Sequence, residues 1–202
     1  MNRYVSIATA CLLFATAAWA EMPKIGKAAP DFTATDAITG KKISLSDFRG
    51  KPVVLEWNNF KCPFVKKFYS PGAMQALQAR AAKNGVVWIT INSSAEGKDG
   101  YIATAQEVKA ALASRKAKPA HYLLDHDGTI GHLYGAKSTP TMVVIDKKGT
   151  LAYQGAIDNR PSSDPADIAG ATNYVTEALS DLDQGRKVKI SSTQAYGCFV
   201  HY

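Results

Sequence analysis

Two of the three cysteines of this chain, Cys62 and Cys198, lie where a thiol could do chemistry. Cys62 follows a predicted buried strand, residues 52–57, and directly precedes Pro63 and a predicted helix. The unpaired N–H groups and partial positive charge at the start of a helix stabilise a thiolate. Because a thiolate attacks both disulfides and peroxides, we predict that Cys62 is a reactive thiol. A structural half-cystine at a strand end is the alternative.

Cys198 is the predicted partner of Cys62. It lies in a segment of small and polar residues, 191–202, that could bring its thiol to Cys62 and resolve an oxidised intermediate. The alternatives are a permanent disulfide that fastens this segment to the rest of the chain, or pairing with another chain. A disulfide between the two cysteines would look the same in the catalytic and the structural case.

The charge of the chain also bears on Cys62. Lys61, Lys66 and Lys67 are predicted to add positive potential near its sulfur, which favours the thiolate. The formal net charge is +7, but the lysines are scattered and form no basic stripe interleaved with aromatics. We therefore expect no nucleic-acid partner.

The N-terminal 20 residues have the form of an export signal. Arg3 supplies a positive charge, residues 5–17 are mostly apolar or small, and Ala18-Trp19-Ala20 fits a signal-peptidase site. Cleavage near Ala20 would remove Cys11, lower the net charge by one, and leave a periplasmic or secreted protein. A lipid-modified Cys11 is disfavoured because no large aliphatic residue opens the preceding Ala8-Thr9-Ala10. The stretch is too short for a confident membrane span, so no stable membrane insertion is expected.

Residues 21–202 are predicted to form one domain with a C-terminal tail from about residue 185. Alternating or apolar runs predict strands, and apolar residues at helical spacing predict helices. Strands separated by helices imply βαβ units and a largely parallel sheet, and a late hairpin adds antiparallel strands. The fold class is an α/β sandwich with a mixed central sheet and an N-terminal β-hairpin. The predicted strands are 31–36, 43–45, 52–57, 86–92, 122–125, 141–146 and 150–154, and the predicted helices or helical turns are 46–50, 63–69, 73–83, 104–115, 130–134 and 174–182.

Three segments together resemble the thioredoxin fold, in the branch of alkyl hydroperoxide reductases and thiol-specific antioxidants. Residues 40–55 resemble the entry of that branch to its first core strand, Cys62-Pro63 opens the following helix, and Ser138-Thr139-Pro140-Thr141 resembles the cis-proline loop. The resemblance covers roughly residues 26–182. A peroxiredoxin-like subgroup with asparagines before Cys-Pro and a C-terminal Tyr-Gly-Cys is the most similar, and Tyr196-Gly197-Cys198 matches that ending.

The resemblance implies roles for further residues. Thr139-Pro140 would be a cis peptide whose backbone edge faces the active site and binds a substrate chain, where the alternative is a trans turn. Glu56, six residues before Cys62, would be a buried acid of raised pKa that shuttles a proton, where the alternative is a surface strand-edge residue. Arg160 would reach the active cysteine and hold a peroxide oxygen, where the alternative is a solvated loop residue.

The sequence also departs from both active-site patterns. A thioredoxin would carry a second cysteine at Val65, and a typical peroxiredoxin would carry Thr or Ser at Asn59. Asn58 and Asn59 could supply the missing hydrogen-bond donor, although turn formation explains them equally well.

We therefore expect a thiol-dependent oxidoreductase. Its substrate would be a peroxide or a protein disulfide, and residues 40–55 and Arg160 favour the peroxide. An unidentified thiol would donate the electrons. A non-catalytic protein with a permanent disulfide, binding a partner or a metal, is the rival. No cofactor is expected, because Cys198 and His201 together supply only two metal ligands.

Overall fold

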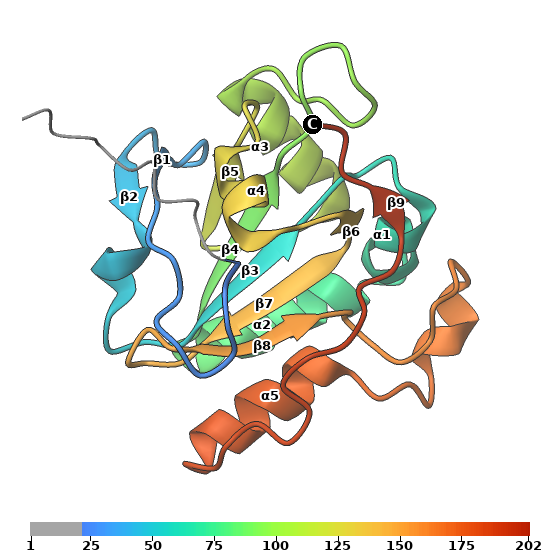
Figure 1. Cartoon of the computed structure of the whole chain (residues 1–202). Coiled ribbons are helices and arrows are strands. Elements are labelled where there is room, and N and C mark those ends of the chain that lie inside the picture. The colour runs from blue at the N-terminus through green and yellow to red at the C-terminus, as the bar shows by residue number, and fades with distance from the viewer. Residues whose placement is uncertain (1–21) are drawn as a thin grey trace, which may run out of the picture.

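The computed structural model describes residues 22–202, so the predicted export signal and Cys11 lie outside the described residues. Figure 1 shows a central sheet with helices on both sides and a C-terminal tail that runs past α5 and α1. The strands are β1 Thr33–Thr35, β2 Lys42–Ser44, β3 Val53–Trp57, β4 Val87–Asn92, β5 His121–Leu124, β6 Ser138–Thr139, β7 Thr141–Ile145, β8 Leu151–Gly155 and β9 Cys198–Phe199. The helices are α1 Pro63–Tyr69, α2 Ala73–Lys83, α3 Ala105–Arg115, α4 Thr129–Tyr134 and α5 Tyr174–Asp183, with 3₁₀ turns at Leu45–Phe48 and Pro165–Ile168.

The central sheet has five strands in the order β5-β4-β3-β7-β8. The β3–β4 and β4–β5 pairs are parallel, and the β3–β7 and β7–β8 pairs are antiparallel. The sheet is therefore mixed, as predicted, although only half of its pairings are parallel. Two small sheets complete the fold, the β1–β2 hairpin and the β6–β9 pair.

Strand β3 is the centre of the core, because all five of its residues are buried. Val54 faces a cluster that includes residues of α1, α2, α3 and α5. Val53, Leu55 and Trp57 face a second cluster formed with α4 and the N-terminal hairpin. Burial on both faces fixes the position of the C-terminal end of β3. The loop that carries Cys62 follows this end directly.

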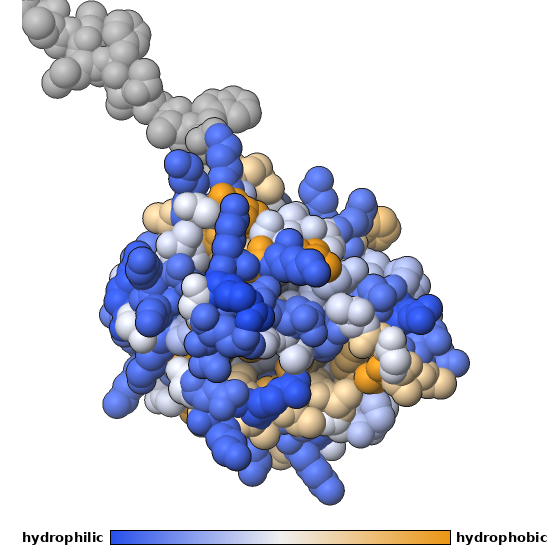
Figure 2. Space-filling model, turned by 90° about the horizontal axis from the view of Figure 1, so that it is seen from below, coloured by the Kyte–Doolittle hydropathy of each residue, from blue (hydrophilic) through white to orange (hydrophobic). Residues whose placement is uncertain are grey.

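The face of the molecule drawn in Figure 2 is mostly hydrophilic. Figure 2, which views the molecule from below, shows polar side chains over most of this face with small apolar patches between them. Among residues 22–202, no helix is long and apolar enough to cross a membrane.

The sequence predicted most of these elements within one or two residues. It missed β6 and β9, which have two residues each, and the 3₁₀ turn at Pro165–Ile168. A two-residue strand carries no periodicity, so only its partner in space can reveal it. The missed strands matter here because each contains a residue of the site.

Candidate active site

Cys62 lies at the point where β3 passes into α1. It is the N-cap residue of α1 in an extended conformation, and Pro63 occupies the first turn. A proline is favoured there because it has no N–H and its fixed φ suits a helix. The residue is 2% exposed and belongs to the main core cluster. The sulfur is thus held at a helix start, as predicted, and is buried.

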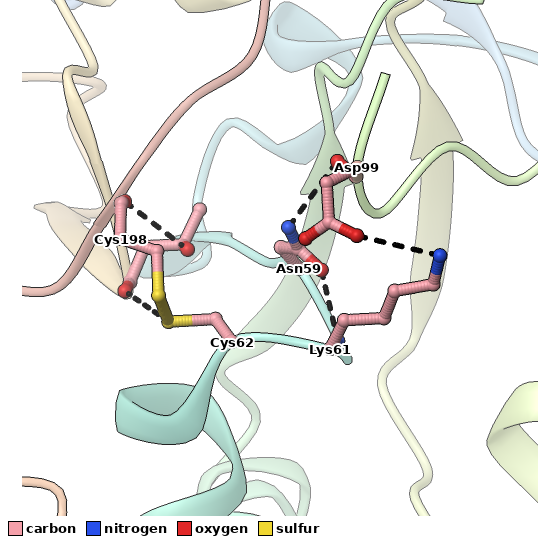
Figure 3. Close-up of a disulfide and its surroundings, with 6 residues drawn as sticks. Asn59, Lys61, Cys62, Asp99 and Cys198 are labelled. Atoms are coloured by element: carbon pink, nitrogen blue, oxygen red, sulfur yellow. Dashed lines mark hydrogen bonds and ion pairs between the residues drawn. A yellow bond between two sulfur atoms is a disulfide. The ribbon is translucent and has the colours of Figure 1, made fainter. Parts of the chain in front are cut away.

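Cys62 forms a disulfide with Cys198, the predicted intramolecular partner (Figure 3). The two Cα atoms are 5.9 Å apart although 136 residues separate the cysteines in sequence. Strand β9 brings Cys198 to this place by pairing antiparallel with β6, in the register Thr139 with Cys198 and Ser138 with Phe199.

The peptide bond between Thr139 and Pro140 is cis, which confirms the prediction for this loop. The carbonyl oxygen of Thr139 lies 3.3 Å from Sγ of Cys62. Thr139 and Pro140 are both buried. The backbone edge that the resemblance assigned to a substrate chain is therefore occupied by the protein's own C-terminal tail.

The tail is fixed on both sides of Cys198. Before it, the Tyr196 ring packs edge-on against Phe64 with centroids 5.9 Å apart, and the Tyr196 hydroxyl donates to the Asp158 carboxylate. Behind it, the Tyr202 hydroxyl donates to the Ala136 carbonyl at 2.5 Å. The backbone adds hydrogen bonds from Val200 N–H to Lys137 O at 3.0 Å and from Ala95 N–H to His201 O at 2.8 Å. The sequence predicted that segment 191–202 could bring Cys198 to Cys62. In the structure these contacts hold the segment in place beside Cys62.

Gly197 permits this docking. A Cβ atom at this position would lie 2.0 Å from the Thr139 carbonyl oxygen, and φ of Gly197 is +126°. A side chain here would collide with backbone, which cannot move aside as a flexible side chain can. The glycine between Tyr196 and Cys198 is thus a steric requirement of the site.

Lys67 is the residue of the site that the sequence assigned wrongly. Its side chain is fully buried, and Nζ lies 3.2 Å from an Asp158 carboxylate oxygen and donates to the Arg160 carbonyl at 2.7 Å. The carboxylate also accepts from Arg160 N–H at 2.9 Å and from the Tyr196 hydroxyl. The ammonium is therefore neutralised by Asp158 and joins α1 to the tail rather than serving Cys62 as a free charge. Lys61 is likewise paired, with Asp99 at 3.3 Å.

The Arg160 side chain is exposed, and it has no hydrogen bond or ion pair with any residue of the described range 22–202; only the backbone of Arg160 joins the buried network. The structure thus matches the solvated-loop interpretation. The asparagines also turn away from the sulfur. Asn58 donates to Glu56 at 2.9 Å, and Asn59 accepts from Lys61 N–H at 2.8 Å, which forms the turn before Cys62.

Glu56 is fully buried in β3, which excludes the surface interpretation. Its carboxylate accepts hydrogen bonds of 2.8–3.1 Å from four side chains, which belong to Asn58, Tyr69, Trp88 and Thr90. Burial raises the pKa of Glu56, and the four donors oppose that shift without cancelling it. None of its hydrogen bonds goes to Cys62, so its role in proton transfer stays a prediction.

The sequence and the fold of this chain are similar to those of known proteins. The model of the AhpC/TSA family matches residues 25–154. The thiol-disulfide oxidoreductase ResA of Bacillus thuringiensis subsp. konkukian is 36% identical over 135 residues, 66% of this chain and 70% of ResA. Mouse peroxiredoxin-2 is 54% identical over 46 residues, 20% of this chain and 23% of that protein. The crystal structure of an uncharacterised conserved protein from Geobacillus kaustophilus has a TM-score of 0.75 and 25% identity, and covers 90% of this chain and 93% of that one.

We expect Gly197→Ala to weaken the Cys62–Cys198 disulfide, because the new methyl group must displace the tail from β6. In a glutathione redox buffer, the equilibrium constant for forming the disulfide should fall about tenfold or more, a change of about 1.4 kcal/mol. Gly185→Ala is the matched control, since Gly185 also has a positive φ of +68° but has open space around it. Equal constants for the two variants would contradict the steric role of Gly197.

We expect Lys67→Met to destabilise the oxidised protein by about 3–5 kcal/mol, because it leaves the Asp158 carboxylate buried without its ammonium partner. The adjacent exposed Lys66→Met should change the free energy of unfolding by no more than about 0.5 kcal/mol. Urea unfolding measures both. Adding Asp158→Asn to Lys67→Met should recover part of the loss, and no recovery would contradict a charge-based cause.

The raised pKa of Glu56 predicts a pH-dependent contribution to stability. The folded protein holds this proton more tightly than the unfolded chain, so Glu56 costs stability as pH rises from its usual pKa through its folded pKa. Relative to Glu56→Gln, the wild-type protein should therefore lose stability as the pH rises from about 4.5, the ordinary value for glutamate, towards 8. Urea unfolding across that range measures the difference. A difference that stays constant, or that favours the wild type with rising pH, would show that the pKa is not raised.

Proposed function

The chain belongs to the AhpC/TSA family of thiol oxidoreductases, and from this premise we propose that it exchanges disulfides with other proteins through the Cys62–Cys198 pair. The observation that carries the proposal is the docked tail, which holds together two sulfurs whose residues are 136 positions apart in sequence. The pair thereby serves the purpose of two neighbouring cysteines, although Val65 stands where a thioredoxin has its second cysteine.

The reaction exchanges two electrons. In the reduced protein, one thiolate attacks a substrate disulfide and forms a mixed disulfide while the other substrate sulfur leaves as a thiolate. The second protein thiolate then attacks the mixed disulfide, closes Cys62–Cys198 and releases the reduced substrate. An external thiol donor restores the dithiol by the reverse steps. No metal or organic cofactor takes part in these steps.

Three observations favour this substrate over a peroxide. Asn59 replaces the hydroxyl of a peroxiredoxin and faces Lys61 and Asp99. The Arg160 side chain is exposed and has no contact with Cys62. The curated relative with the longer match is a thiol-disulfide oxidoreductase, whereas the match to peroxiredoxin-2 covers 20% of this chain.

We also propose that the protein works after export, on the support of the N-terminal 20 residues and of the disulfide itself. Disulfides persist in oxidising compartments such as the bacterial periplasm. A thiol pair in such a compartment needs an electron donor that reaches it there.

We expect the reduced protein to reduce a disulfide-bonded model protein such as insulin, and Cys62→Ser and Cys198→Ser each to lower the rate at least a hundredfold. Each substitution removes one of the two sulfurs that the reaction needs. Turbidity of the released insulin chain measures the rate, with dithiothreitol as the electron source and its own background subtracted.

A parallel titration of thiols with hydrogen peroxide separates the rival functions. Oxidation of Cys62 much faster than free cysteine, without insulin reduction, would support the peroxidase instead. A disulfide with a reduction potential below about −300 mV and no activity in either assay would support the permanent disulfide.

A further inference from the structure

We propose that Cys198, and not Cys62, is the sulfur that an external thiol attacks when the disulfide is reduced. The inference rests on the proposed exchange function and assigns the first step of its reductive half, in which an external thiol opens the protein disulfide, to one atom. It reverses the expected division of labour, in which Cys62 meets the outside partner and Cys198 only resolves. The observation behind it is the unequal exposure of the two residues.

Cys62 is covered from every direction. The residue is 2% exposed and lies within the core cluster, whereas Cys198 is partly exposed at the edge of the same cluster. Thiolate displacement at a disulfide proceeds along the S–S axis, from behind the sulfur that is attacked. An attack on Cys62 would therefore have to come through protein, because the residue is 2% exposed.

The docked tail keeps Cys62 covered. The Tyr196 hydroxyl donates to Asp158 on one side of Cys198, and Tyr202 occupies the surface of α4 on the other. A Cβ at Gly131 would lie 2.4 Å from the Tyr202 hydroxyl oxygen, so α4 carries a glycine where the ring packs. Uncovering Cys62 requires breaking at least one of these two attachments, whereas Cys198 is partly exposed while both are intact.

The proposed step is balanced in atoms and electrons. An external thiol loses its proton to solvent, and its thiolate forms a new S–S bond to Sγ of Cys198. The Cys62–Cys198 bond breaks, and its electron pair goes to Sγ of Cys62, which leaves as a thiolate. A second external thiolate then attacks the outer sulfur of the mixed disulfide and releases the Cys198 thiolate. Two external thiols become one external disulfide, and the protein disulfide becomes a dithiol.

The test uses the oxidised wild-type protein and reduced glutathione as the external thiol. Brief reaction, quenching with acid and N-ethylmaleimide, and peptide mass spectrometry identify which cysteine carries glutathione. We expect at least ten times more glutathione on Cys198, with Cys62 alkylated, than the reverse. The reverse pattern would overturn this inference and leave the proposed function standing. A disulfide that neither glutathione nor dithiothreitol opens in the folded protein would overturn both.

A second measurement uses Cys62→Ser and Cys198→Ser, each in a Cys11→Ser background so that one thiol is left. The rate of reaction with an aromatic disulfide such as Ellman's reagent is measured for each variant as a function of pH. The pH dependence gives the fraction of thiolate, and dividing the rate by this fraction gives the rate constant of the thiolate. The buried Cys62 thiolate should react at least tenfold more slowly than the Cys198 thiolate in the folded proteins. The rates should become similar in guanidinium chloride. Equal rates in the folded state would overturn the inference.

Discussion

The site depends on one interaction, the antiparallel pairing of β9 with β6. This pairing joins two strands of two residues each, Ser138–Thr139 and Cys198–Phe199, and it brings together cysteines that are 136 residues apart in sequence. So short a ladder is not stable by itself. It holds because Gly197 allows close approach and because side chains on either side, above all Tyr196 and Tyr202, pack against α1 and α4. The cysteines meet as a consequence of this docking.

Lys67 and Glu56 are two buried ionisable side chains near the site, and the protein stabilises them in different ways. Lys67 is paired with Asp158, so the charges offset each other and the pair joins α1 to the tail. Glu56 has no cation among its hydrogen-bond partners and is surrounded by neutral donors, so burial raises its pKa. An ionised carboxylate without a cation is costly to bury, and four hydrogen bonds offset only part of that cost. The Lys67–Asp158 ion pair fixes the geometry of the site. The raised pKa of Glu56 moves the titration of its carboxyl group to a pH closer to neutrality.

Whether the sequence predicted a feature of the fold or the site depended on how far apart in the chain the interacting residues lie. Apolar runs and helical spacing predicted the five-stranded sheet, and the Cys62-Pro63 and Thr139-Pro140 pairs predicted the helix start and the cis peptide. These signals are local. The Lys67–Asp158 pair joins residues 91 positions apart, so no local pattern could show that Lys67 is buried rather than solvated. The direction of the Arg160 side chain could not be predicted for the same reason, which is why a role at Cys62 and a solvated loop residue were both open in the sequence.

The docked tail also bears on the direction of electron flow. In the chain-entropy model, a crosslink that closes a loop of 136 residues stabilises a fold by about 5 kcal/mol. Folding and disulfide formation are thermodynamically linked. A fold that holds the two reduced thiols together therefore favours formation of the disulfide by the same free energy. The anchors at Tyr196 and Tyr202 involve no cysteine, so breaking the disulfide removes neither of them. A dithiol held in this way gives up electrons readily, because closing the disulfide requires little further ordering of the chain. The geometry therefore favours a protein that reduces the disulfides of its partners over one that introduces them.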